Sequence, residues 1–170
     1  LIVGCLGGLF TLSSCTAPTN VKDYSAYVNP FIGTGGHGHT FPGAVVPHGM
    51  IQPSPDTRID GWDACSGYYY ADSTINGFSH THVSGTGCCD YGDVLLMPTV
   101  GKQQYRTTDP QSQRLAYASS FSHKNEIAEP GYYSVFLDTY QVKAEISSTK
   151  RGAIHRYTFP ENAESGFIID

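Results

Sequence analysis

The sequence predicts a mainly β protein, an antiparallel β-sandwich with long ordered loops. Its 170 residues include 19 glycines, 10 prolines and 12 tyrosines, a composition that suits strands and turns better than a helix bundle. Only 15% of the residues are charged and 12% are aromatic, which argues against a disordered chain. Short apolar runs separated by turn residues recur through the second half. The length is enough for one domain with one modest core.

The first 14 residues are predicted to be the remnant of a signal peptide rather than part of the fold. They are apolar, uncharged and too short to span a bilayer. The stretch LSSC that ends at Cys15 resembles a bacterial lipobox, so we expect a lipid on Cys15 and a polar tether over residues 15–26. An ordinary signal peptide and a short core helix are the alternatives. The chain begins with Leu1 and stops after an apolar run, so we expect a fragment cut at both ends.

Residues 27–74 are predicted to form loops and short strands, because prolines and glycines recur too often for a helix. The glycine-rich stretch GTGGHGHTFPG, residues 33–43, lacks the spacing of a phosphate-binding loop. A short helical turn is expected within residues 119–131, where Ser122 can cap it. Later apolar stretches predict strands at residues 93–101, 131–140, 141–149, 152–160 and 166–170.

The net charge of −5 is unevenly distributed along the sequence. Residues 25–101 hold six aspartates, no glutamate and a single basic residue, Arg58, so this segment carries the whole acidic excess. The absence of a basic stripe argues against nucleic acid as a partner. Clustered aspartates suit calcium, sugar hydroxyls or cationic ligands. The alternative is that these short acidic side chains serve turns and caps.

Three cysteines besides Cys15 would remain after export: Cys65, Cys88 and Cys89. The odd number allows at most one disulfide in an oxidising compartment, and Cys65 can bridge to either of the other two. A bridge between the adjacent pair would be strained. No C-x-x-C is present, so neither a thioredoxin-type motif nor a thiolate zinc finger is supported.

His80 and His82 stand one residue apart in the stretch GFSHTH. On a strand, both imidazoles would lie on the same face, an arrangement found in zinc sites. A zinc site needs a third protein ligand; His37, His39, Asp90 or a cysteine are candidates, and the spacing selects none of them. The alternative is that both histidines hydrogen-bond loop carbonyls, while nearby glycines let the backbone fold tightly around them. The sequence therefore assigns no metal ligand.

Trp62, the only tryptophan, lies between Asp60 and Asp63. Sugar sites are often built this way, because an indole covers the apolar face of a pyranose and carboxylates accept hydrogen bonds from its hydroxyls. The alternative is that Trp62 belongs to the core. The residues alone identify no paired carboxylates for glycoside chemistry and no nucleophile elbow, so they assign no catalytic group.

A series of motifs in residues 27–101 resembles the start of glycoside hydrolase family 92. In order, these motifs are V-N-P-F-I-G-T, P-G-A, P-x-G-M-x-Q-x-S-P-D-T, S-G-Y, G-F-S-H-T-H-x-S-G-T-G and D-Y-G-D. The resemblance implies the N-terminal portion of a lipoprotein member of a family of calcium-dependent exo-α-mannosidases, which invert the anomeric centre. Such enzymes of gut Bacteroides-like bacteria trim terminal α-linked mannose from N-glycans or mannan, and an outer-membrane lipoprotein is expected, periplasmic or on the cell surface.

The resemblance also implies an architecture and a division of roles. Residues 27–170 would form an N-terminal β-sandwich packed on an (α/α)6 barrel, with the active site at their junction. The catalytic acid, the base and the calcium ligands are expected downstream of Asp170, so this chain alone is expected to be inactive. Its expected partners are α-mannoside glycans, the barrel of the same protein and a membrane reached through Cys15.

By the same resemblance, Trp62 is expected to contact the substrate, at the leaving-group sugar. The further candidates for the pocket wall are Asp60, Asp63, Cys65, His80, His82 and Asp90. The G-F-S-H-T-H stretch is expected to shape the domain junction rather than to hold a metal or a redox pair. Two other functions remain open from the sequence: a mannose-binding lipoprotein domain without catalysis, and a purely structural domain.

Overall fold

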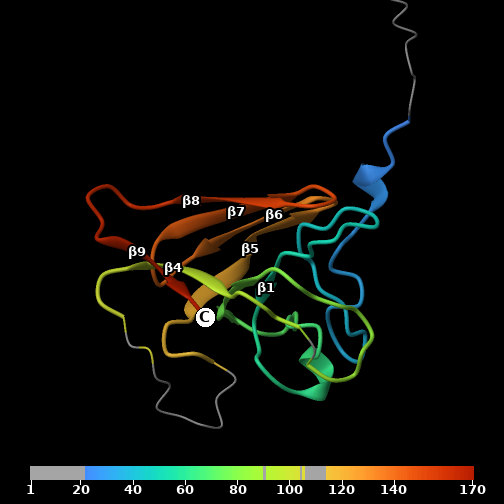
Figure 1. Cartoon of the computed structure of the whole chain (residues 1–170), viewed down its shortest axis with the longest axis horizontal. Helices are drawn as coiled ribbons and strands as arrows, with labels where there is room; N and C mark the ends of the chain where they lie inside the picture. The colour runs from blue at the N-terminus through green and yellow to red at the C-terminus, as the bar shows by residue number, and fades with distance from the viewer. Residues whose placement is uncertain (1–21, 90, 104, 106–113) are drawn as a thin grey trace, which may run out of the picture.

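Two antiparallel sheets lie face to face in the computed structural model, with long loops at one end (Figure 1). The structure describes residues 22–89, 91–103, 105 and 114–170, so the predicted signal segment, Cys15 and Asp90 lie outside the described residues. No helix within these ranges is both long and apolar enough to cross a membrane. In chain order the elements are η1 (Ser25–Tyr27), β1 (Ser54–Asp56), η2 (Trp62–Ala64), β2 (Thr74–Ile75), β3 (Gly77–Ser79), β4 (Leu96–Val100), β5 (Ser119–Glu129), β6 (Tyr132–Leu137), β7 (Val142–Ser148), β8 (Ala153–Thr158) and β9 (Ser165–Ile169).

The sheet topology confirms the predicted antiparallel sandwich. One sheet has the strand order β1-β3-β4-β9, and the other has the order β2-β5-β6-β7-β8. In the first sheet β4 pairs with β9 along its whole length, from Leu96 opposite Ile169 to Val100 opposite Ser165. In the second sheet β5 to β8 form a meander of successive hairpins. All five strands predicted from apolar stretches are present.

The hydrophobic core fills the space between the two sheets. Phe78 on β3 is fully buried, and its ring centroid lies 6.4 Å from that of Tyr133 on β6. On β7 the three apolar residues of the predicted alternation, Val142, Ala144 and Ile146, are fully buried. Of the two polar residues between them, Lys143 is exposed but Glu145 is buried, so the alternation is only partly confirmed. Burying one large apolar side chain contributes about 1.5–3 kcal/mol, so this layer supplies most of the stabilisation of the sandwich.

The helical turn expected near Ser122 is wrong, because residues 119–129 form β5. Pairing with β6 overrides the local capping signal, as tertiary contacts often override propensity. The register between β5 and β6 shifts between Phe121 and Glu126, which marks a bulge. The Ser122 hydroxyl accepts a hydrogen bond from the Lys124 N–H within this bulge, so the polar group that suggested a helix cap serves an irregular strand instead.

The bulge brings Glu126 into the interior, where its side chain is completely buried. Its carboxylate accepts hydrogen bonds from Tyr68 (3.0 Å) and Tyr133 (2.6 Å), and His123 Nδ1 lies 2.6 Å away. A buried carboxylate is costly unless such partners satisfy it. Because Tyr68 comes from a loop and Tyr133 from β6, this network joins the loops to the five-stranded sheet.

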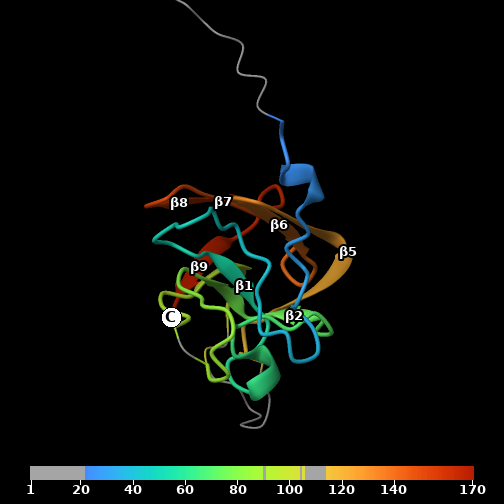
Figure 2. The ribbon, with the colours of Figure 1, turned by 90° about the vertical axis from the view of Figure 1, so that its right-hand side faces the viewer.

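The long loops form one layer, which we define as residues 29–53, 57–73, 80–89 and 91–95 and call the loop layer. It lies at one end of the sandwich and faces the viewer in Figure 2. Backbone hydrogen bonds attach it to the sheets, for example from Met50 N to Lys150 O (2.7 Å) and from Gly131 N to Val45 O (2.9 Å). Arg58 makes a bidentate pair with Asp72 inside it. The residues singled out in the sequence lie mainly in this layer.

Candidate functional site

A cleft of about 200 Å³ opens in the loop layer and contains two of the residues predicted from the sequence, Cys65 and His82. Asp60, Trp62, Asp63 and His80 lie outside its lining. The structure therefore separates the predicted residues into a cleft group, a group around Trp62, and His80, which has other partners. The cleft is also lined by Asp56, Arg58, Cys89 and Tyr91.

His82 forms a buried ion pair with Asp56 at the bottom of this cleft. Its Nδ1 lies 2.7 Å from the carbonyl oxygen of Gln52, and its Nε2 lies 2.9 Å from Asp56 Oδ1. Both partners are acceptors, so this arrangement suits a ring whose two nitrogens both donate, which is the imidazolium form. Burial lowers the pKa of His82, but the charge and hydrogen bond of Asp56 outweigh it, so the pKa is raised above its ordinary value.

Gly67 makes room for this pair. Its φ is +88°, a region that side chains with a Cβ rarely adopt, and a Cβ here would collide with Asp56 Oδ1. The other carboxylate oxygen of Asp56 accepts a hydrogen bond from the Ser79 N–H at 2.9 Å. The pair is therefore fixed by the backbone on two sides, which makes the cleft floor rigid.

His80 has different surroundings from His82, and the sequence interpretation of a shared strand face is wrong. Strand β3 ends at Ser79, so neither histidine belongs to a strand. His80 Nδ1 bonds the carbonyl oxygen of Val94 at 2.8 Å, and its ring stacks on His155. Both histidines thus bond loop carbonyls, as the alternative interpretation expected, and no metal-ligand cluster among the described residues includes either of them.

The cysteines of the loop layer form none of the disulfides considered from the sequence. Cys65, which is buried, and Cys89, which is exposed, are both free thiols, and this excludes every bridge between them and Cys88. Partial burial raises the pKa of Cys89, and the nearby charge of Asp60 raises it further. A thiol in this environment is a poor nucleophile, so the structure assigns no redox or nucleophilic role to it.

Trp62 presents its indole to solvent, and the alternative that it belongs to the core is wrong. Its side chain is 61% exposed on the single-turn helix η2. Gly87 packs against one end of the indole, since a Cβ at Gly87 would lie 2.6 Å from Trp62 Cζ3. The ring of His39 meets it edge-on with centroids 4.9 Å apart. The indole is therefore held in place by two loops while much of its surface stays free.

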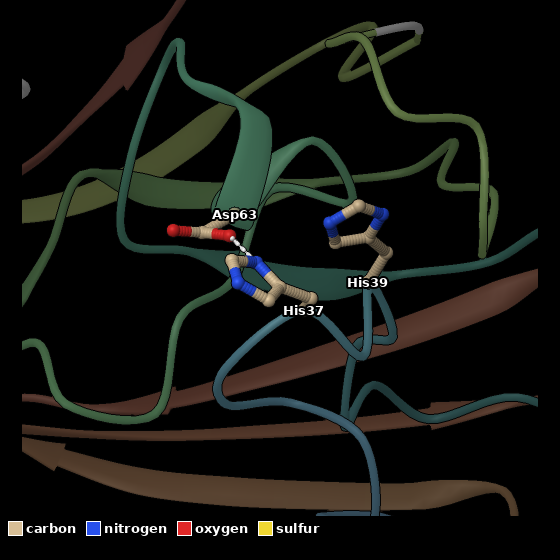
Figure 3. Close-up of side chains that lie close together, drawn as sticks. All are labelled: His37, His39 and Asp63. Carbon is tan, nitrogen blue, oxygen red and sulfur yellow. Dashed lines mark hydrogen bonds and ion pairs between the residues drawn. The ribbon is translucent and has the colours of Figure 1, made fainter.

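The two aspartates beside Trp62 have local partners. Asp60 Oδ1 accepts a hydrogen bond from the Gly61 N–H at 2.7 Å, which shapes the turn into η2. Asp63 Oδ1 lies 2.5 Å from His37 Nδ1 (Figure 3). Their remaining carboxylate oxygens leave acceptor capacity next to the indole.

Sequence reasoning missed the role of Asp56 and Arg58 in the cleft. Asp56 stands in the stretch PSPDT as the last residue of β1, and a charge that directly follows two buried prolines is the signal that could have identified it. Arg58 is the only base of the acidic half, but its partner Asp72 is 14 residues away and no spacing rule connects them. The roles of these two residues in the cleft could be recognised only from the fold.

Comparison with known proteins decides the family. The family model described as "Glycosyl hydrolase family 92 N-terminal domain" matches residues 27–170. The chain belongs to glycosyl hydrolase family 92. Its structure is similar to that of the family GH92 α-mannosidase BT3965 from Bacteroides thetaiotaomicron, solved with mannoimidazole, with a TM-score of 0.80 and 45% identity over 86% of this chain.

More distant relatives agree with this family assignment. The inverting mannosidase BT2199 from Bacteroides thetaiotaomicron VPI-5482 is 33% identical over 88% of this chain, with a TM-score of 0.72. An uncharacterized secreted glycosidase of Arthroderma benhamiae is 33% identical over 84% of it. The chain covers 19% of BT3965, 20% of BT2199 and 18% of the Arthroderma protein, so it spans about a fifth of their lengths. The sandwich described above corresponds to the N-terminal β domain of family 92 proteins.

Proposed function

We propose that the protein containing this chain is an exo-α-mannosidase that hydrolyses terminal α-linked mannose from N-glycans or mannan with inversion. The proposal is supported by 45% identity to a solved α-mannosidase and by the likeness to a relative described as an inverting mannosidase. Within that enzyme, this domain supplies one wall of the sugar pocket and no catalytic group.

The observation that carries this role is the exposed indole of Trp62. An indole that is anchored at its edges and free on its surface is suited to cover the apolar face of a pyranose. Asp60 and Asp63 beside it offer carboxylate oxygens to sugar hydroxyls. We place the leaving-group mannose on this surface, and the nearby cleft with the His82–Asp56 pair serves as the rigid support behind it.

The chemical step belongs to residues beyond Asp170 in this proposal. Inversion requires one carboxylic acid to protonate the leaving oxygen and a second carboxylate to activate water on the opposite face. We propose that both groups, together with a calcium ion that helps to distort the bound mannose, are held by an (α/α)6 barrel that packs on this domain. If calcium is required, a chelator should abolish activity and added calcium should restore it.

The enzyme is proposed to act outside the cytoplasm as an outer-membrane lipoprotein. The lipobox-like LSSC and a relative described as a secreted glycosidase support export. A lipid on Cys15 would then attach the enzyme to the membrane. Incorporation of labelled palmitate that disappears in Cys15→Ser would support this attachment, and equal labelling of both proteins would contradict it.

The substrate role is tested by Trp62→Ala in the complete enzyme. We expect kcat/KM for an α-mannobioside to fall at least about tenfold, which corresponds to about 1.4 kcal/mol of lost transition-state stabilisation. Trp62→Phe should keep part of the activity, because a smaller aromatic face remains. Tyr27→Ala, which removes an exposed aromatic residue from η1, is the control and should leave kcat/KM unchanged. Unchanged kinetics in Trp62→Ala would remove Trp62 from the sugar pocket.

A further inference from the structure

Three side chains of the loop layer converge in Figure 3, and one of them, His39, contacts the Trp62 indole. His37 and His39 come from the glycine-rich loop of residues 33–43, and Asp63 comes from η2. One donor atom of each residue lies within 4.8 Å of the donor atoms of the other two. The loop and η2 are separated in the sequence, so only the fold brings these three residues together.

His39 gives an independent indication that a ligand belongs here. The residue is only 8% exposed, and its Nε2 is a buried nitrogen without a hydrogen-bond partner among the described residues. Figure 3 shows the nitrogen remote from the ring's attachment point turned toward His37 and Asp63. An unsatisfied buried polar atom costs about 1–3 kcal/mol, so a nitrogen held in this position calls for a partner.

We propose that His37, His39 and Asp63 form a binding site for a divalent transition-metal ion of the zinc class. Two imidazoles and one carboxylate are a donor set that zinc uses with a fourth position left to water. Imidazole nitrogens favour zinc, copper, nickel or cobalt over calcium, which takes oxygen ligands. The site is thus distinct in its chemistry from the calcium ion proposed for catalysis.

The geometry allows coordination with small movements of exposed groups. Ligand atoms about 2.0–2.2 Å from a tetrahedral zinc ion lie about 3.3–3.5 Å from one another. The His37 side chain is 80% exposed and that of Asp63 is 36% exposed, so both can turn about the fixed His39. The metal would replace the proton shared by His37 Nδ1 and Asp63 Oδ1, and this proton would leave to solvent.

Metal binding would fasten the glycine-rich loop to η2. The His39 ring contacts the Trp62 indole edge-on, so fixing His39 also fixes the orientation of the indole. The site would act through position rather than through chemistry on the sugar. The inference does not depend on mannoside hydrolysis, because it rests on the three side chains alone.

The test is metal titration of the 170-residue chain, whose single tryptophan is Trp62. We expect calorimetry to show one Zn²⁺ per chain with proton release, and Co²⁺ to quench the Trp62 fluorescence. We expect His37→Ala, Asp63→Asn and His39→Asn each to weaken zinc binding at least about tenfold, since each removes one of three ligands. Asparagine tolerates the left-handed backbone of His39, where φ is +53°.

His48→Asn is the matched control. His48 is also a loop histidine with positive φ, +57°, and it lies outside the cluster. The His48→Asn variant should bind zinc as the unchanged chain does, and Co²⁺ should quench its Trp62 fluorescence to the same extent. Circular dichroism should show the same fold for all variants. The proposal is overturned if the unchanged chain binds no zinc. It is also overturned if Ca²⁺ competes with Zn²⁺ at equal concentration. The same holds if the three ligand variants bind Zn²⁺ as well as the control does, because the cysteine thiols would then be the zinc ligands.

Discussion

The sandwich and the loop layer are stabilised by different kinds of interaction. Between the sheets most buried side chains are apolar, as Phe78, Met97 and Val142 illustrate, although the sandwich also buries the Glu126 carboxylate. The interior of the loop layer is polar, with Thr57, Ser66 and His82 all buried and hydrogen-bonded. Apolar burial is insensitive to proton concentration, whereas a buried ion pair is not. The His82–Asp56 pair of the loop layer should therefore lose stability as pH rises above 6.5, a range in which purely apolar packing such as that of Phe78 does not change.

The largest expected effect comes from breaking the buried ion pair with His82→Ala. The change leaves the Asp56 carboxylate buried without its cation, which costs about 3–5 kcal/mol in comparable pairs. Because the pKa of His82 is raised above 6.5 in the folded protein, its stabilising contribution is complete below pH 6.5 and is lost as pH rises through the folded pKa. Urea unfolding at acidic and alkaline pH should show that the variant lacks this alkaline loss of stability.

Two further variants separate this effect from ordinary loss of packing. Phe78→Ala should cost about 3–5 kcal/mol by creating a cavity, with no dependence on pH. His80→Ala should cost less than His82→Ala, because His80 is only half-buried and its ring bonds one carbonyl. If Phe78→Ala and His82→Ala respond identically to pH, the distinction between the two regions fails.

A smaller effect is expected from Gly67→Ala. The positive φ alone costs about 1–2 kcal/mol for a residue with a Cβ. The added methyl group also displaces Asp56, so the total should exceed that of Gly85→Ala, whose φ is +79° and whose Cβ would meet nothing within 4 Å. Thermal unfolding of both variants measures the difference. Equal losses would mean that the contact between Gly67 and Asp56 is unimportant.

The smallest effect is expected on the outer face of the sandwich, from Arg156→Ala. Hydrogen bonds from Arg156, together with one from Tyr132, lower the pKa of Glu145 to about 2. This lowered pKa gives stability that is present above pH 4.5 and is lost as pH falls toward 2. In Arg156→Ala the pKa of Glu145 should move back toward 4.5, which NMR titration of its side chain can follow. An unchanged pKa would show that Tyr132 and Lys143 are sufficient.

The sandwich could be predicted from the sequence much better than the loop layer. Strands such as β7 can be recognised in the sequence, because Val142, Ala144 and Ile146 alternate with polar residues. Strands β1, β2 and β3 contain only two or three residues each, too few to show a period. Strand β5 was expected to be partly helical, because a bulge hides its alternation.

The candidate site was only partly predictable for a related reason. Trp62 stood out because a single indole between carboxylates has a recognisable use, and its exposure in the structure rules out the core alternative while its contact with substrate stays a prediction. The spacing of His80 and His82 suggested a shared role, but a turn after β3 sends them to different partners. The convergence of His37 and His39 with Asp63 depends on the path of two separate loops, which no local pattern records.

The pairing of β4 with β9 has a consequence for the order of folding. Strands β5 to β8 are neighbours in sequence and form hairpins by closing short loops, which is fast. Strand β4 pairs on one edge with β3, but its other edge is completed only when β9, far along the chain, is available, and closing so long a loop is slow. Strands β1 and β3, which flank the loop layer, belong to that late sheet. On a translating ribosome the meander of β5 to β8 would therefore form before β9 completes the sheet that borders the loop layer.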